Sequence, residues 1–118
     1  NLVVEPGKPY RAENCGVGYQ GCGWIFSPDD IFDRELLTDL LEPPGLVGLP
    51  NGAVVERLKG VFRVGKEWVS VDRLENEVTV SGIAYRNDSR LEVITPEKVK
   101  ADWDKLERCL LNCLQLKP

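Results

Sequence analysis

Four cysteines offer the widest range of chemistry in this sequence, because a thiolate can bind a metal, form a disulfide or act as a nucleophile. They are Cys15, Cys22, Cys109 and Cys113. One hypothesis is a four-cysteine zinc site, although the spacings C-x6-C and C-x3-C differ from the C-x2-C spacing typical of such sites. The alternative is that the last three are small buried side chains, Cys22 on a strand and the other two on a helix. We expect reduced thiols, because two cysteines on adjacent turns of one helix seldom align for a disulfide.

Histidine is absent from the chain. Its absence removes the commonest general base, the serine and cysteine triads built on that base, and the usual zinc ligand. Carboxylates are plentiful, but Asp29, Asp30 and Asp33 cluster before a predicted helix, where capping and the helix dipole explain them. We therefore predict no catalytic residue in this chain.

Residues 60–66 match the phosphate-binding pattern G-x-x-x-x-G-K. That motif requires Ser or Thr as the next residue, to hold magnesium, whereas this chain has Glu67. A phosphate-binding loop also leads into a helix N-terminus, and residues 61–64 instead read as a strand that enters a hairpin. The sequence therefore predicts no nucleotide or other cofactor bound by this chain.

Three basic residues could form a docking surface. Arg57 and Lys59 point to the same side of a predicted strand, and Arg90 lies in the last predicted strand. If these strands are neighbours, they make a basic stripe that could bind an acidic partner or another domain. The alternative is a solvated sheet face with cross-strand pairs to acids such as Asp72 or Glu92, and both interpretations stay open.

The elements that must position these residues are the strands of one sheet and two helices. Alternation and turn residues predict strands over 18–26, 54–64, 67–74, 77–85 and 90–95. The joints at 65–66, 75–76 and 87–88 are short enough for hairpins. The order β-α-β-β-β-β-α predicts an α+β fold, a mainly antiparallel sheet of four to five strands with two helices on one face.

The helices have clear boundary signals. The first is capped by Asp33, presents an apolar stripe and ends before Pro43-Pro44; its stripe comprises Leu36, Leu37, Leu40 and Leu41. The second is predicted to begin with Thr95 as N-cap and Pro96 in the first turn. Its apolar positions are Val99, Trp103, Leu106, Leu110 and Leu114.

Domain organisation is simple. Residues 1–16 are rich in Pro, Gly and Asn, and we interpret them as a linker or arm. Residues 17–118 are expected to form one domain, with a loop over 42–53. Because the chain starts at Asn1 and contains no Met, we expect a fragment or a processed product.

Composition limits the classes of partner. Of 118 residues, 42% are hydrophobic and 29% are charged, with a net charge of −4, as in an ordinary globular domain. This mild acidity argues against nucleic-acid binding, because such binding needs a clustered basic face. There is no apolar run long enough to span a membrane and no signal peptide pattern, so we expect a cytoplasmic protein.

Several motifs carry a family resemblance. Residues 56–61 (Glu-Arg-Leu-Lys-Gly-Val) precede a hairpin, and residues 88–94 (Asp-Ser-Arg-Leu-Glu-Val-Ile) precede the last helix. This arrangement resembles the C-terminal domain of CobW-type GTPases, with its R-x-K-G and S-R-L strands. Residues 18–26, Phe32-Asp33 and 101–103 (Ala-Asp-Trp) resemble the YeiR-like, zinc-binding branch of that family.

The resemblance, over about residues 16–115, implies a role for the whole protein. CobW-type proteins have an N-terminal GTPase domain with a P-loop and a C-x-C-C metal motif, and they are implicated in delivering zinc or cobalt to clients or in cobalamin synthesis. None of those motifs lies in this chain. The resemblance therefore implies no GTP or metal site here, and it implies two partners, the protein's own GTPase domain and a client metalloprotein.

Three hypotheses follow. The first is an accessory domain that regulates, or docks a client of, a GTP-dependent metallochaperone. The second is a free-standing interaction module that shares only the fold. The third is direct metal binding through the four cysteines. The sequence leaves open whether the chain forms an oligomer.

Overall fold

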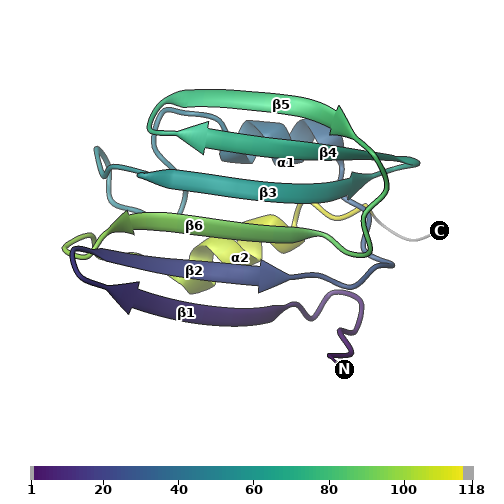
Figure 1. The fold of residues 1–118 in the computed structure, drawn as a ribbon, viewed down its shortest axis with the longest axis horizontal. Helices are drawn as coiled ribbons and strands as arrows, with labels where there is room; N and C mark the ends of the chain where they lie inside the picture. The colour runs from purple at the N-terminus through teal and green to yellow at the C-terminus, as the bar shows by residue number, and fades with distance from the viewer. Residues whose placement is uncertain (1, 116–118) are drawn as a thin grey trace.

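A computed structural model describes residues 2–115 of the chain. It contains one antiparallel sheet with both helices on the same face (Figure 1). The strands are β1 (Tyr10–Gly16), β2 (Tyr19–Ile25), β3 (Arg57–Val64), β4 (Glu67–Leu74), β5 (Glu77–Ile83) and β6 (Arg90–Pro96), and the helices are α1 (Arg34–Leu41) and α2 (Trp103–Leu111). The α+β class is confirmed. The end of the predicted domain, residues 116–118, lies outside the described residues.

The sheet has six strands in the order β1-β2-β6-β3-β4-β5, so the prediction of four to five strands was wrong. The additional strand is β1, formed by residues that the sequence suggested were a linker. It pairs with β2 from Tyr10 opposite Ile25 to Gly16 opposite Tyr19. An edge strand pairs with only one neighbour and buries few side chains. The sequence of β1 therefore contains no run of apolar residues that would indicate a strand. The element order is therefore β-β-α-β-β-β-β-α.

The placement of β6 was also not foreseen. The turns at residues 65–66 and 75–76 form the predicted hairpins between β3, β4 and β5. Residues 87–88 do not form a hairpin, because β6 lies between β2 and β3 rather than beside β5. The connection from β5 crosses in front of the ends of β4 and β3 (Figure 1), where Tyr85 packs edge-on against Trp68 with ring centroids 5.7 Å apart.

Helix α1 begins where predicted. The Asp33 carboxylate accepts a hydrogen bond of 2.9 Å from the backbone N–H of Leu36, which satisfies a donor that the first turn leaves unpaired. Of the predicted stripe, Leu37 and Leu41 are fully buried, whereas Leu36 stays 51% exposed. The helix is followed by the predicted loop over 42–53, which contains no helix or strand.

Helix α2 begins seven residues later than a Thr95 cap would place it, at Trp103 with Asp102 as N-cap. The predicted start was wrong because residues 95 and 96 complete β6 opposite β2. Within β6 the Thr95 hydroxyl donates a hydrogen bond of 2.7 Å to the carbonyl of Val54. Thr followed by Pro suits the end of a strand as well as the start of a helix, since proline is tolerated at both.

The core fills the space between the sheet and the two helices. Trp24 of β2 meets Trp103 of α2 edge-on, with centroids 6.1 Å apart. Phe32 lies between Phe26 and Phe62, at 5.0 and 5.1 Å. Truncating any one of these buried rings to alanine typically costs about 3–5 kcal/mol, so this layer contributes strongly to holding the helices against the sheet.

The loop over 42–53 is tied to both helices. The guanidinium of Arg73, a β4 residue that is 1% exposed, donates to the carbonyls of Leu41 at 3.2 Å and Gly45 at 2.7 Å. At the other helix the backbone N–H of Asp102 donates to the carbonyl of Gly48 at 2.6 Å. Gly48 has φ +88° and no space for a side chain, since a Cβ would lie 2.6 Å from the Asp102 carbonyl.

Candidate partner-docking site

Neither α1 nor α2 covers the opposite face of the sheet (Figure 1), and we call it the open face. In β3 the buried residues Leu58 and Phe62 point toward the helices. Because side chains alternate along a strand, Arg57, Lys59 and Val61 point to the open face. The prediction that Arg57 and Lys59 share a side is therefore confirmed.

The pairing of β3 with β6 brings the third basic residue onto the same face. Arg90 lies directly opposite Val61, and Glu92 lies opposite Lys59. Residues that are directly opposite in an antiparallel pair share one face of the sheet. The three predicted residues therefore lie on two neighbouring central strands.

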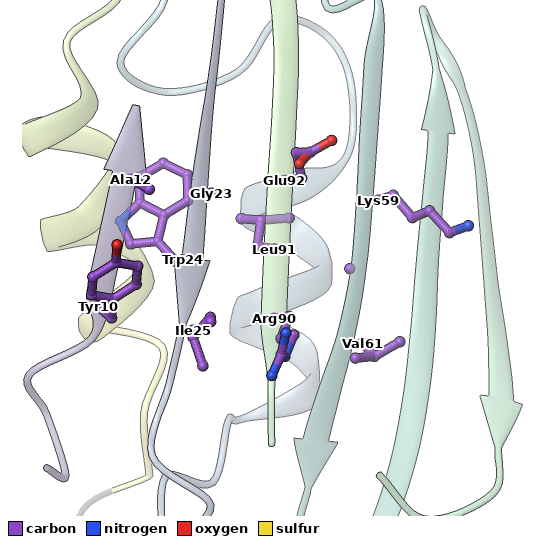
Figure 2. A pocket seen from close by; sticks show the side chains of 11 residues that line it. Tyr10, Ala12, Gly23, Trp24, Ile25, Lys59, Val61, Arg90, Leu91 and Glu92 are labelled. Carbon is purple, nitrogen blue, oxygen red and sulfur yellow. The ribbon is translucent and has the colours of Figure 1, made fainter. Parts of the chain in front are cut away.

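A hollow of about 420 Å³ lies on the open face where β1, β2, β6 and β3 run side by side (Figure 2). It is lined by Tyr10, Ala12, Gly23, Trp24, Ile25, Lys59, Gly60, Val61, Arg90, Leu91 and Glu92. Ala12 and Gly23 lie opposite one another and provide a floor of small residues. Larger apolar side chains, including Tyr10, Ile25 and Val61, rise around that floor.

Gly23 creates space rather than relieving crowding. A Cβ built there would have one neighbour within 4 Å, the Leu91 carbonyl oxygen at 3.7 Å, which is an ordinary contact. Gly60 differs, because its Cβ would lie 2.5 Å from the Phe62 ring and 3.1 Å from the Arg90 carbonyl oxygen. Gly60 is therefore required for packing, whereas the absence of a side chain at Gly23 leaves the hollow open.

Charged residues border the hollow on its β6 and β3 side (Figure 2). Lys59 and Arg90 both line it, together with Glu92, whereas Arg57 lies further along β3 and outside the lining. Arg90 donates to the Asp88 carboxylate at 2.7 Å, and this hydrogen bond raises the pKa of Arg90.

Arg57 and Lys59 also have acidic neighbours. Arg57 donates to Asp72 at 3.3 Å, and Lys59 lies opposite Asp72 on one side and Glu92 on the other. The cross-strand pairing suggested as the alternative to docking is therefore present. Exposed pairs of this kind contribute only about 0–1 kcal/mol, so a partner's charges can exchange with them.

The four cysteines do not form one cluster, although Cys109 and Cys113 are neighbours at the end of α2, where the Cys113 thiol donates to the Cys109 carbonyl at 3.2 Å. Cys109 is partly exposed rather than buried. Cys22 is buried on β2 and Cys113 is buried beyond α2, while Cys15 is exposed, and all four are free. Burial raises the pKa of the Cys22 thiol to about 12 and that of Cys113 to about 11, so the thiolate that binds a metal is disfavoured at both. Within residues 2–115, no three His, Cys, Asp or Glu side chains are grouped to hold a metal.

Residues 60–66, which match the phosphate-binding pattern, form a strand and a hairpin turn, as predicted from the sequence. Residues 60–64 lie in β3, and Gly65 with Lys66 forms the tight turn to β4. Gly65 has φ +69°, a conformation that glycine adopts readily in such turns. The chain continues as a strand, so no helix N-terminus is available there for a phosphate.

The motifs that carry the family resemblance mostly fix the fold. Ser89 is fully buried; its hydroxyl accepts from the backbone N–H of Arg63 at 2.9 Å, and its carbonyl accepts from that of Phe26 at 2.9 Å. The Gln20 amide donates to the carbonyls of Pro96 and Val99. Sequence reasoning missed these roles, since a single polar residue gives no sign of being buried until its neighbours are known.

These observations define a class of protein: a small α+β domain whose sheet is covered on one face by α1 and α2 and carries a hollow on the other. No helix in the described part of the chain could cross a membrane. Over 103 residues the chain is 36% identical to the zinc chaperone YeiR of Escherichia coli (strain K12), a match that covers 86% of this chain. The chain belongs to the CobW family, as a C-terminal domain of the YeiR-like branch.

The matched segment is 28% of the length of that relative, so the chain spans less than a third of it. No family model matches the sequence, and no solved structure matches it. The resemblance read from the short motifs is confirmed by this alignment, which covers 86% of the chain.

Proposed function

We propose that this chain is the accessory domain of a CobW-type, GTP-dependent metallochaperone and that its open face docks a partner. The partner is the GTPase domain of the same protein or a client metalloprotein. The observation that carries the proposal is the hollow over Ala12 and Gly23, on a sheet face that neither helix covers.

The hollow has the composition of an interface centre. Its floor and most of its walls are apolar, and charged side chains stand at its rim, as in protein–protein interfaces with a hydrophobic core and a polar rim. It is also held rigid, since each of the strands that line it is paired along its length. A preorganised surface loses little conformational entropy when a partner binds.

In this proposal, the binding sites for the metal and for the nucleotide lie in the part of the protein outside this chain. Zinc is the metal that the name of the relative supports, and cobalt handling and cobalamin synthesis are the alternatives that the family resemblance brings. The chain itself supplies neither a catalytic group nor a metal ligand, and the whole protein acts in the cytoplasm. A free-standing interaction module would use the same face but would lack the GTPase domain.

The test is a binding measurement with charge-reversal variants. The probe is the portion of Escherichia coli YeiR outside the matched 103 residues, titrated with this chain by calorimetry. Lys59→Glu is expected to weaken binding about tenfold, equivalent to about 1.4 kcal/mol, because it removes the rim lysine and leaves a third acid beside Glu92 and Asp72. Lys105→Glu, an exposed residue of α2 on the other side of the sheet, is the matched control and should leave affinity unchanged.

Two results would contradict the proposal. If Lys59→Glu and Lys105→Glu change the affinity equally, the open face is not the docking face. If the purified chain alone hydrolyses GTP, it is not an accessory domain without catalytic groups.

A further inference from the structure

The sheet ends in two edge strands, β1 and β5, each paired on one side only. Edge strands offer unpaired N–H and C=O groups, and proteins usually protect them with charges, proline or bulges. β1 is protected in this way. Arg11 and Glu13 stand on it, and Arg11 makes ion pairs of 2.8 Å with Asp104 and 3.5 Å with Glu107 of α2.

β5 has only one charged residue, Glu77 at its start, and otherwise lacks these protections. Its residues after Glu77 are Val-Thr-Val-Ser-Gly-Ile, with no charge and no proline. It pairs with β4 without interruption, from Glu77 opposite Leu74 to Ile83 opposite Trp68, so it has no bulge to turn the edge away. In Figure 1 it forms the upper edge of the sheet, and no other element among residues 2–115 runs along its outer side.

The sequence of β5 is also complementary to itself. We propose that β5 pairs antiparallel with β5 of a second copy of this chain, about a two-fold axis at Val80. In that register Thr79 faces Ser81 of the second copy and Val78 faces Gly82. Glu77 faces Ile83, so no like charges are opposed across the new pair.

The geometry of the two sheets permits this pairing. A two-fold axis perpendicular to the sheet keeps both helix layers on the same side, because opposite residues of an antiparallel pair share a face. The result is one continuous sheet built from two six-stranded sheets. Helix α1 lies behind this end of the sheet (Figure 1).

Pairing along one strand buries much less than the roughly 1,200–2,000 Å² of a stable interface. The dimer is therefore expected to form in a concentration-dependent way. Association by main-chain hydrogen bonds at a sheet edge is a common mode of recognition. This inference concerns a different surface from the open face and does not depend on the proposed function.

The register is tested by disulfide trapping. Val80→Cys, in a Cys15→Ser background that removes the exposed native thiol, places two cysteines opposite each other on the two-fold axis. Mild oxidation of the whole chain is expected to give a covalent dimer of twice 13.2 kDa. Thr79→Cys in the same background is the matched control, because residue 79 faces residue 81 and the two thiols are too far apart to bridge.

Sedimentation equilibrium provides a second readout. The average mass of the unmodified chain should rise above 13.2 kDa with concentration, and Thr79→Lys should abolish the rise, whereas Asn14→Lys on β1 should not. Circular dichroism checks that each variant is folded. The proposal is overturned if the unmodified chain stays monomeric, if Asn14→Lys abolishes the rise, or if Val80→Cys and Thr79→Cys cross-link equally.

Discussion

Arg73 is the residue whose surroundings are least expected for its type. Its side chain is 1% exposed, and its guanidinium donates to the carbonyls of Leu41, Gly45 and Glu75 at 2.7–3.2 Å. Burial lowers its pKa, yet an arginine stays charged in proteins. The three carbonyl oxygens therefore take the place of water around a buried cation.

We predict that Arg73→Met destabilises the fold by about 3 kcal/mol, since hydrogen bonds to a charged group contribute about 1.5–3 kcal/mol and unpaired buried carbonyls add a further penalty. Urea unfolding measures this loss. Arg86→Met is the control, because Arg86 is exposed and donates only to the nearby carbonyls of Ala84 and Tyr85. Equal losses for the two variants would show that the buried guanidinium does not hold the loop over 42–53.

The roles of some single residues could be predicted from the sequence, and those of others could not. Asp33 was identified as a cap from its place before an apolar stripe, and it caps α1. Arg73 and Ser89 gave no such signal, because their partners come from distant segments that only the fold brings together. A buried polar residue is defined by tertiary contacts, and one sequence does not contain them.

At the scale of elements, the strands with strong alternation were predicted well and the others were not. The predicted boundaries of β4 are those of the structure, Glu67–Leu74, because turn residues flank it and Val69 and Val71 alternate with Ser70 and Asp72. β1 was missed since most of its side chains are exposed. The place of β6 between β2 and β3 depends on long-range pairing, which no local pattern reports.

The start of α2 gives a test at this scale. Asp102→Ala is expected to destabilise the protein by about 1 kcal/mol, because the Asp102 carboxylate accepts a hydrogen bond of 3.0 Å from the backbone N–H of Lys105. Asp39→Ala, an exposed acid inside α1, should change stability by less than about 0.5 kcal/mol. Unfolding midpoints in urea compare the two. No difference between them would mean that the helix does not begin at residue 103.

At the scale of the whole molecule, the two faces of the sheet differ in what covers them. One face and both helices enclose the core, and the other presents the hollow and its charged rim. The basic residues of that rim could be predicted from the alternation of one strand and the family motifs. The hollow could not be predicted from the sequence, because its floor is formed by Gly23 together with Ala12, and Ala12 lies on β1, a strand that was not predicted.

The most direct test of the docking account is to fill the hollow. Gly23→Val adds a side chain over the floor where a Cβ meets only an ordinary contact, so the variant is expected to fold. Its affinity for the portion of YeiR outside the matched segment should fall at least about tenfold, or about 1.4 kcal/mol. Gly82→Val is the matched control, since Gly82 lies on β5, outside the hollow, with nothing within 4 Å of its Cβ position.

The measurement is the ratio of the two dissociation constants, determined by calorimetry at concentrations where the chain is monomeric. Docking in the hollow predicts that Gly23→Val binds at least about tenfold more weakly than Gly82→Val. Equal affinity of the two folded variants for the partner would contradict it, because a partner that tolerates a filled hollow does not dock there.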